Sequence, residues 1–90
     1  MAYEVKLTSA VLRDLARLPM SVGTRILDEV EALAQEPDPI RHVKRLKGGS
    51  LNPFYSLRVG RYRAILNIYD DVLLIIVVEA GHRSKIYRKH

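Results

Sequence analysis

The clearest structural signal in this sequence is the heptapeptide Leu57-Arg58-Val59-Gly60-Arg61-Tyr62-Arg63. Its centre, Gly60-Arg61, is typical of a two-residue hairpin turn between alternating strands. That turn predicts a register in which Arg58 pairs with Arg63. Because side chains alternate across a sheet, the two arginines would share one face while the apolar residues of the same strands face a core.

Two like charges directly across a strand pair destabilise a sheet. A sequence tolerates this cost when an anion lies between the charges, and arginine forks match the oxygens of phosphate. The alternative is a pair of solvated arginines whose guanidinium groups turn apart. With the predicted register, Arg58 and Arg63 therefore indicate a phosphate site.

The patterns on both sides of this hairpin predict the order β-α-α-β-β-β. Glu4 to Leu7 alternates like a strand, and Thr8 is a suitable cap for a helix that stops at Pro19. A second helix would start at a Ser21 cap and end at Glu36-Pro37. Ile40 to Asn52 reads as irregular and basic.

The last three strands are predicted at Phe54–Val59, Tyr62–Tyr69 and Val72–Val78, and the third should end at Glu79-Ala80-Gly81. The fold class expected is α+β, with an antiparallel helical hairpin packed on one face of a mainly antiparallel sheet whose other face stays open. Residues 1–90 would form a single domain.

Charge is distributed unevenly along the 90 residues. Positions 1–40 carry four Lys/Arg and seven Asp/Glu, a net of −3, whereas positions 41–90 carry eleven against three, a net of +8. This asymmetry suggests a polyanionic partner, and charge alone leaves a solvated basic surface that binds nothing specific as an equal alternative. No cysteine is present, and no apolar run is long enough for a signal peptide or a membrane span, so a soluble cytoplasmic protein is expected.

Three motifs resemble the RelE branch of the RelE/ParE toxin superfamily across the whole chain: Arg-Leu-Lys-Gly at 45–48, Tyr-Ser-Leu-Arg-Val-Gly-Arg-Tyr-Arg at 55–63, and Gly-His-Arg at 81–83 followed by Tyr87. The resemblance implies a RelE-like toxin of a type II toxin–antitoxin system. Such a toxin is a ribosome-dependent mRNA endoribonuclease (an mRNA interferase) that inhibits translation without a metal or cofactor. Its partners would be a RelB-like antitoxin, the ribosome and mRNA. The alternatives are a ParE-like inhibitor of DNA gyrase and an inactive basic RNA-binding module.

The resemblance also implies roles for individual residues. Arg63 and Arg83 match the arginines that stabilise the phosphate, Arg58 matches a basic residue of the active face, and Tyr87 matches the tyrosine that positions or activates the 2′-hydroxyl. Ser56 departs from the pattern, because some active members have a basic residue there. Without the resemblance, the simplest interpretation of Tyr87 is a ring packed on the sheet.

The general base is left open between Arg45, Lys47, His82 and Lys85. The cations near the motifs are expected to contact RNA or the ribosome: Arg45, Lys47, Arg61, His82, Lys85 and Arg88. A metal nuclease would need clustered carboxylates, and the basic half offers only Asp70, Asp71 and Glu79, so no metal site is expected.

Overall fold

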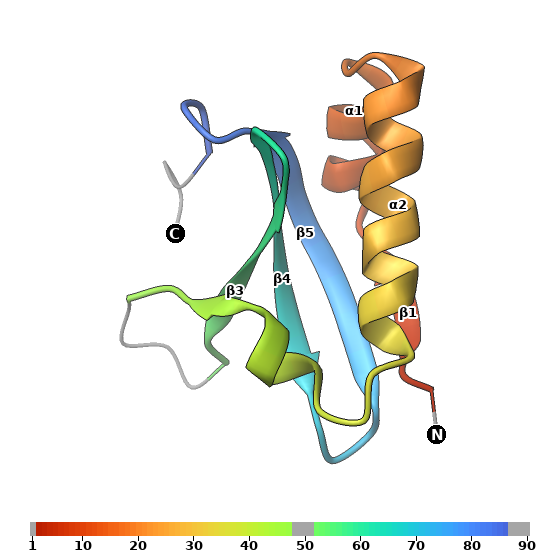
Figure 1. The fold of residues 1–90 in the computed structure, drawn as a ribbon, viewed down its shortest axis with the longest axis vertical. Coiled ribbons are helices and arrows are strands. Elements are labelled where there is room, and N and C mark those ends of the chain that lie inside the picture. The colour runs from red at the N-terminus through yellow and green to blue at the C-terminus, as the bar shows by residue number, and fades with distance from the viewer. Residues whose placement is uncertain (1, 48–51, 87–90) are drawn as a thin grey trace.

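The computed structural model describes residues 2–47 and 52–86. Its elements follow in the order β1 (Glu4–Leu7), α1 (Ser9–Ala16), α2 (Met20–Ala34), the 3₁₀ helix η1 (Pro39–His42), β2 (Lys44–Arg45), β3 (Phe54–Val59), β4 (Tyr62–Tyr69) and β5 (Leu74–His82). Figure 1 shows α1 and α2 side by side on one side of the sheet, with β5 and β4 facing them. The expected α+β class is confirmed.

The five strands form one mixed sheet in the order β1-β5-β4-β3-β2. β1 pairs with β5 in parallel, and the other neighbouring pairs are antiparallel. β5 is therefore an interior strand, as its continuous apolar sequence predicts. Parallel strands need a crossover connection, and here both helices, η1 and strands β2–β4 lie between β1 and β5 in the chain.

The helical hairpin starts as the sequence predicts and differs at its second cap. The hydroxyl oxygen of Thr8 accepts a hydrogen bond of 3.1 Å from the backbone N–H of Val11. The expected cap at Ser21 is wrong: α2 already begins at Met20, and Pro19 occupies its N-cap without a side-chain hydrogen bond. The Pro19 carbonyl instead accepts the backbone N–H groups of Val22 and Gly23 at 3.0 Å.

The hydrophobic core lies between the helices and the sheet. α2 contributes Ile26, Val30 and Leu33, and the facing strands contribute Leu66 and Val77; all five are at most 4% exposed. Spacings of three and four residues along α2 place its apolar side chains on one stripe, which explains why this face docks on the sheet. Within residues 2–47 and 52–86, no helix has the length and hydropathy needed to cross a membrane.

β5 is longer and starts later than the sequence predicts. The turn continues through Leu73, whose φ of 52° is left-handed and breaks the extended conformation expected from Val72. The strand then runs past Glu79 to His82, because β4 continues beside it and pairs Tyr62 with His82. Pairing with β4 therefore extends the strand through Gly81, where the sequence predicts its end.

The segment after α2 is not irregular throughout, since it holds η1 and the short strand β2. β2 pairs with β3 in the register Lys44↔Ser56 and Arg45↔Tyr55. The sheet face away from the helices is also only partly open. Ser56, Ile65 and Asn67 lie on it and are 4%, 0% and 8% exposed.

Candidate functional site

The two arginines of the central hairpin lie directly opposite each other. β3 and β4 pair Arg58 with Arg63, which confirms the predicted register. Gly60 has a φ of +61°, a conformation that glycine adopts at little cost in the first position of a type II′ hairpin turn. The turn thus sets the register, and the register brings the two like charges together on the face away from the helices.

A cavity of about 520 Å³ opens beside this pair and is called the basic cavity below. It is lined by Arg41, His42, Val43, Lys44, Ser56, Arg58 and Arg63. β3 and β4 supply its floor, and η1 with β2 supplies a wall. Among the described residues that line it, none is acidic. His42 approaches a carboxylate outside the cavity, where its Nε2 lies 3.4 Å from Glu36 Oε2.

Arg63 is the most enclosed cation of the basic cavity. Its Nε atom is buried, and it has no hydrogen-bond partner within the described part of the chain. A buried donor without a partner costs about 1–3 kcal/mol. Such exceptions in a folded protein are rare, so each calls for an explanation. Here the arginine is held in place by its strand and its surroundings and presents positive charge to the cavity.

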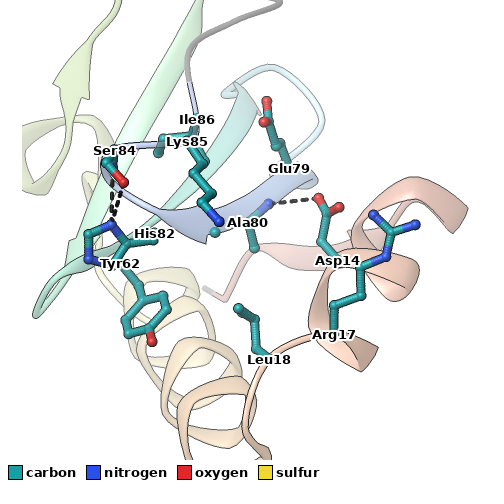
Figure 2. Close-up of a pocket in the computed structure, with 11 residues that line it drawn as sticks. Asp14, Arg17, Leu18, Tyr62, Glu79, Ala80, His82, Ser84, Lys85 and Ile86 are labelled. Atoms are coloured by element: carbon teal, nitrogen blue, oxygen red, sulfur yellow. Dashed lines mark hydrogen bonds between the residues drawn. The ribbon is translucent and has the colours of Figure 1, made fainter.

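A second and larger cavity, about 680 Å³, lies on the helix side of the sheet between α1 and the end of β5 (Figure 2). We call it the helix-side cavity; its lining includes Asp14, Arg17, Tyr62, His82 and Lys85. It carries both signs of charge. The Asp14 carboxylate accepts a hydrogen bond of 3.1 Å from the backbone N–H of Ala80.

The imidazole of His82 belongs to this second cavity. Its ring meets the Tyr62 ring edge to face, with centroids 5.6 Å apart and an interplanar angle of 83°. Its Nδ1 lies 2.8 Å from the hydroxyl of Ser84 and accepts the Ser84 backbone N–H at 3.2 Å. His82 and Tyr62 are register partners, so both side chains are on the helix face, opposite to the arginine pair.

The remaining predicted site residues lie apart from the basic cavity or outside the described residues. Arg45 pairs with Tyr55 of the core, which places its side chain on the helix face. Arg83 is exposed in the turn after β5, and its backbone N–H donates to the Arg61 carbonyl at 2.9 Å. Lys47 is exposed after β2. Tyr87 and Arg88 lie outside the described residues.

Three basic residues of the cavity are missing from the sequence-based set: Arg41, His42 and Lys44. The sequence shows the basic run that contains them, but not that it folds into a 3₁₀ turn and a strand. Once Lys44 is known to pair with Ser56, alternation places Lys44 on the arginine face and Arg45 on the other. No cluster of three metal-ligating side chains occurs among residues 2–47 and 52–86.

Comparisons with known proteins agree along almost the whole chain. Residues 5–87 match the family described as "ParE toxin of type II toxin-antitoxin system, parDE". Toxin RelG of Mycobacterium tuberculosis is 34% identical over 92 residues, covering 99% of this chain and 100% of RelG. Putative toxin RelE1 of Methanocaldococcus jannaschii is 30% identical over 90 residues, covering 98% of each chain.

Solved structures show the same fold. The RelBE2 toxin–antitoxin complex of M. tuberculosis contains a chain that superposes with a TM-score of 0.80 at 27% identity, covering 93% of this chain and 94% of that one. A chain of the archaeal RelE–RelB complex of Pyrococcus horikoshii gives a TM-score of 0.75 at 29% identity, covering 94% and 99%. The protein therefore belongs to the ParE toxin family of type II toxin–antitoxin systems, as a RelE-like member of the RelE/ParE superfamily.

Proposed function

We propose that this toxin is an endoribonuclease that cleaves mRNA on the ribosome. The observation that supports this most directly is the basic cavity, in which Arg58 and Arg63 face each other across a strand pair. Its lining holds no carboxylate among the described residues, and three of its residues, Ser56, Arg58 and Arg63, belong to β3 and β4. Such an arrangement suits a phosphodiester, because guanidinium groups bind phosphate oxygens in a bidentate manner.

In the proposed reaction the 2′-oxygen of a ribose attacks the adjacent phosphorus, and negative charge grows on the non-bridging oxygens. Cations already fixed at that position stabilise the transition state without reorganising during the reaction. Loss of one such donor costs about 2.7–4 kcal/mol by analogy with oxyanion holes. We assign this electrostatic role to Arg58 and Arg63, and the same role to Arg83 through its approach from the end of β5.

Tyr87 is proposed to position or activate the attacking 2′-hydroxyl, on the strength of its place in the family motif. General acid–base assistance of this kind contributes about 10²–10⁴-fold. Of the four candidates for the base, Arg45, His82 and Lys85 lie on the helix face or line the helix-side cavity. We propose that Arg45, Lys47, Arg61, His82, Lys85 and Arg88 contact RNA or the ribosome.

We further propose that a cognate antitoxin neutralises this toxin. The M. tuberculosis structure is the toxin–antitoxin complex RelBE2, and the P. horikoshii structure is a complex of RelE with RelB. In this chain the helical hairpin exposes apolar side chains that a partner would cover, notably Leu12 at 53% and Met20 at 86%. Co-expression with the neighbouring open reading frame should give a complex that survives purification at moderate salt, and separate elution of the two proteins would argue against it.

The cleavage proposal is tested by mapping mRNA ends after induced expression in cells. Primer extension should reveal new 5′ ends within translated regions, and these ends should disappear when translation initiation is blocked. Purified toxin should cut mRNA on programmed ribosomes. Intact mRNA in both settings would contradict the proposal.

A ParE-like activity is the second candidate, because the matching family description names ParE toxins. In that case expression would stop growth while mRNA stays intact, and DNA breaks would appear that require gyrase. An inactive RNA-binding module would produce neither cuts nor breaks. One induction experiment, read by primer extension and by DNA integrity, therefore separates all three functions.

A further inference from the structure

Lys44 lies on the same sheet face as the arginine pair, although it comes from a different part of the chain. It is directly opposite Ser56 in the β2–β3 pair, and Arg58 is two positions farther along β3 on that face. A diagonal neighbour of this kind is roughly 7–8 Å away between Cα atoms, a distance that long side chains span. The Lys44 ammonium and the Arg58 guanidinium can therefore approach a common anion.

Lys44 and Arg63 both line the basic cavity and come from β2 and β4, the two strands that flank β3. Ser56 lies between them on the floor, is 4% exposed and carries no charge. Arg58 and Arg63 come from paired positions of β3 and β4, while Arg41 and Lys44 come from η1 and β2. An anion in this cavity would therefore meet cations from two separate parts of the chain.

The ordinary explanation for Lys44 is protection of a sheet edge. β2 is the edge strand next to β3, and exposed lysines on edge strands discourage pairing with other molecules. The other edge of the sheet offers a matched case. Lys6 is an exposed lysine on β1, at the opposite edge, and it does not line the basic cavity.

We propose that Lys44 is a further cation of the phosphate site and contacts the same phosphodiester as Arg58 and Arg63. Its position beside Ser56 supplies positive charge where the floor of the cavity has none. This inference rests on the proposed function for its RNA substrate, yet it makes a prediction about binding that does not depend on cleavage. Lys44 is assigned to phosphate binding and charge stabilisation.

The binding test uses the full-length purified toxin and a labelled single-stranded RNA whose scissile 2′-hydroxyl is replaced by hydrogen. Affinity is measured over a series of salt concentrations. Each phosphate contact to a single strand contributes about 0.7 to the slope of log K against log salt. Lys44→Ala should lower the slope by about 0.7, Lys44→Arg should keep it, and Lys6→Ala should leave it unchanged. Equal slopes for Lys44→Ala and Lys6→Ala would overturn the proposal.

The cleavage test uses single-turnover kinetics on programmed ribosomes. Loss of one charge-assisted contact predicts a decrease on the order of tenfold to a hundredfold for Lys44→Ala. Lys6→Ala should cleave at the wild-type rate, and Lys44→Arg should retain most activity. If wild type cuts and Lys44→Ala matches it, the role of Lys44 is wrong. If wild type does not cut at all, the proposed function fails and the salt slopes still decide the role of Lys44.

Moving the charge across the strand pair provides a further check. In the double variant Lys44→Ser/Ser56→Lys, the ammonium starts from the neighbouring strand but remains on the same face. It should recover the salt slope lost in Lys44→Ala. Because Ser56 is buried, the double variant is first compared with wild type by thermal melting; if it is unfolded, the Arg and Ala variants at position 44 decide the question.

Discussion

The basic cavity and the helix-side cavity lie on opposite faces of the same sheet and differ most in the sign of their charge. The basic cavity combines arginine, lysine and histidine with no acidic lining among the described residues. The helix-side cavity is larger, yet it contains the carboxylate of Asp14, which is engaged by the backbone, and it is also lined by Glu79, whose register partner Ile65 lies on the other face. Size alone would favour the helix-side cavity, whereas the balance of charge favours the smaller basic cavity, which is the surface we propose for a polyanion.

The largest expected effect comes from replacing one arginine by alanine in the basic cavity, with the same replacement in the helix-side cavity as a control. Arg63→Ala should lower single-turnover cleavage by about 10²–10³-fold, because it removes a fixed cation from the transition state. Binding of the uncleavable RNA should weaken much less, since other cations still attract the backbone. The matched control is Arg17→Ala in the helix-side cavity. If Arg63→Ala lowers RNA affinity and cleavage rate by the same factor, the basic cavity binds RNA but does not stabilise the transition state.

Asp14 tests the view that the helix-side cavity supports the fold. Asp14→Ala leaves the buried N–H of Ala80 without its acceptor, which should lower the free energy of unfolding by about 1–3 kcal/mol. Asp14→Asn keeps an oxygen acceptor and should lose less. Urea denaturation measures both variants. The cleavage rate per folded molecule should remain at the wild-type value, and a rate defect in fully folded Asp14→Ala would make this cavity part of the active site.

Tyr3 provides a smaller structural effect at the far end of the sheet. Its hydroxyl donates a hydrogen bond of 2.7 Å to Asp70 Oδ1, and burial followed by this bond raises the pKa of Tyr3 from 10.0 to about 12. Tyr3→Phe should therefore lower the free energy of unfolding by about 1 kcal/mol.

The pH dependence of that difference has a defined direction. Because the folded state raises the Tyr3 pKa, the contribution is complete below pH 10 and disappears as pH rises through 12. Paired urea titrations of wild type and Tyr3→Phe at neutral and alkaline pH measure the change. If the difference in free energy of unfolding between wild type and Tyr3→Phe grew above pH 10, the raised pKa of Tyr3 would be contradicted.

The smallest expected effect concerns His82, which we place at the RNA or ribosome surface. His82→Ala should change RNA affinity by about twofold, as expected for a contact worth roughly 0.5 kcal/mol. Its cleavage rate at saturation should be unchanged. A large loss of rate at normal affinity would show that His82 takes part in the chemistry and that both sheet faces contribute to the active site.

The sequence is sufficient for most of the fold because local and global signals agree. Gly60-Arg61 predicts the β3–β4 register, and the apolar spacing in α2 predicts its buried stripe. The expectations fail where tertiary pairing decides the conformation. β5 continues to His82 because β4 lies beside it, and β2 exists because β3 offers an edge.

The site is predictable to the extent that it depends on one hairpin. Arg58 and Arg63 are brought together by a turn that can be read locally, so their pairing is foreseen. Arg41 and Lys44 reach the same cavity through η1 and β2, and the choice between Lys44 and Arg45 depends on a register of two residues. A shift by one position would exchange their faces, which no local pattern in the basic run reveals.

The contact between β1 and β5 also determines when this protein can fold during its own synthesis. The β1–β5 pairs cannot form until β5 has left the ribosome, and the hydrogen bond between Tyr3 and Asp70, which are 67 positions apart, must likewise wait for Asp70. At roughly 5–20 residues per second, β1 and the helices wait several seconds for their central strand. The toxin thus completes its sheet only after β5 has left the ribosome, so a nascent chain that lacks β5 carries the arginine hairpin without its neighbouring strand.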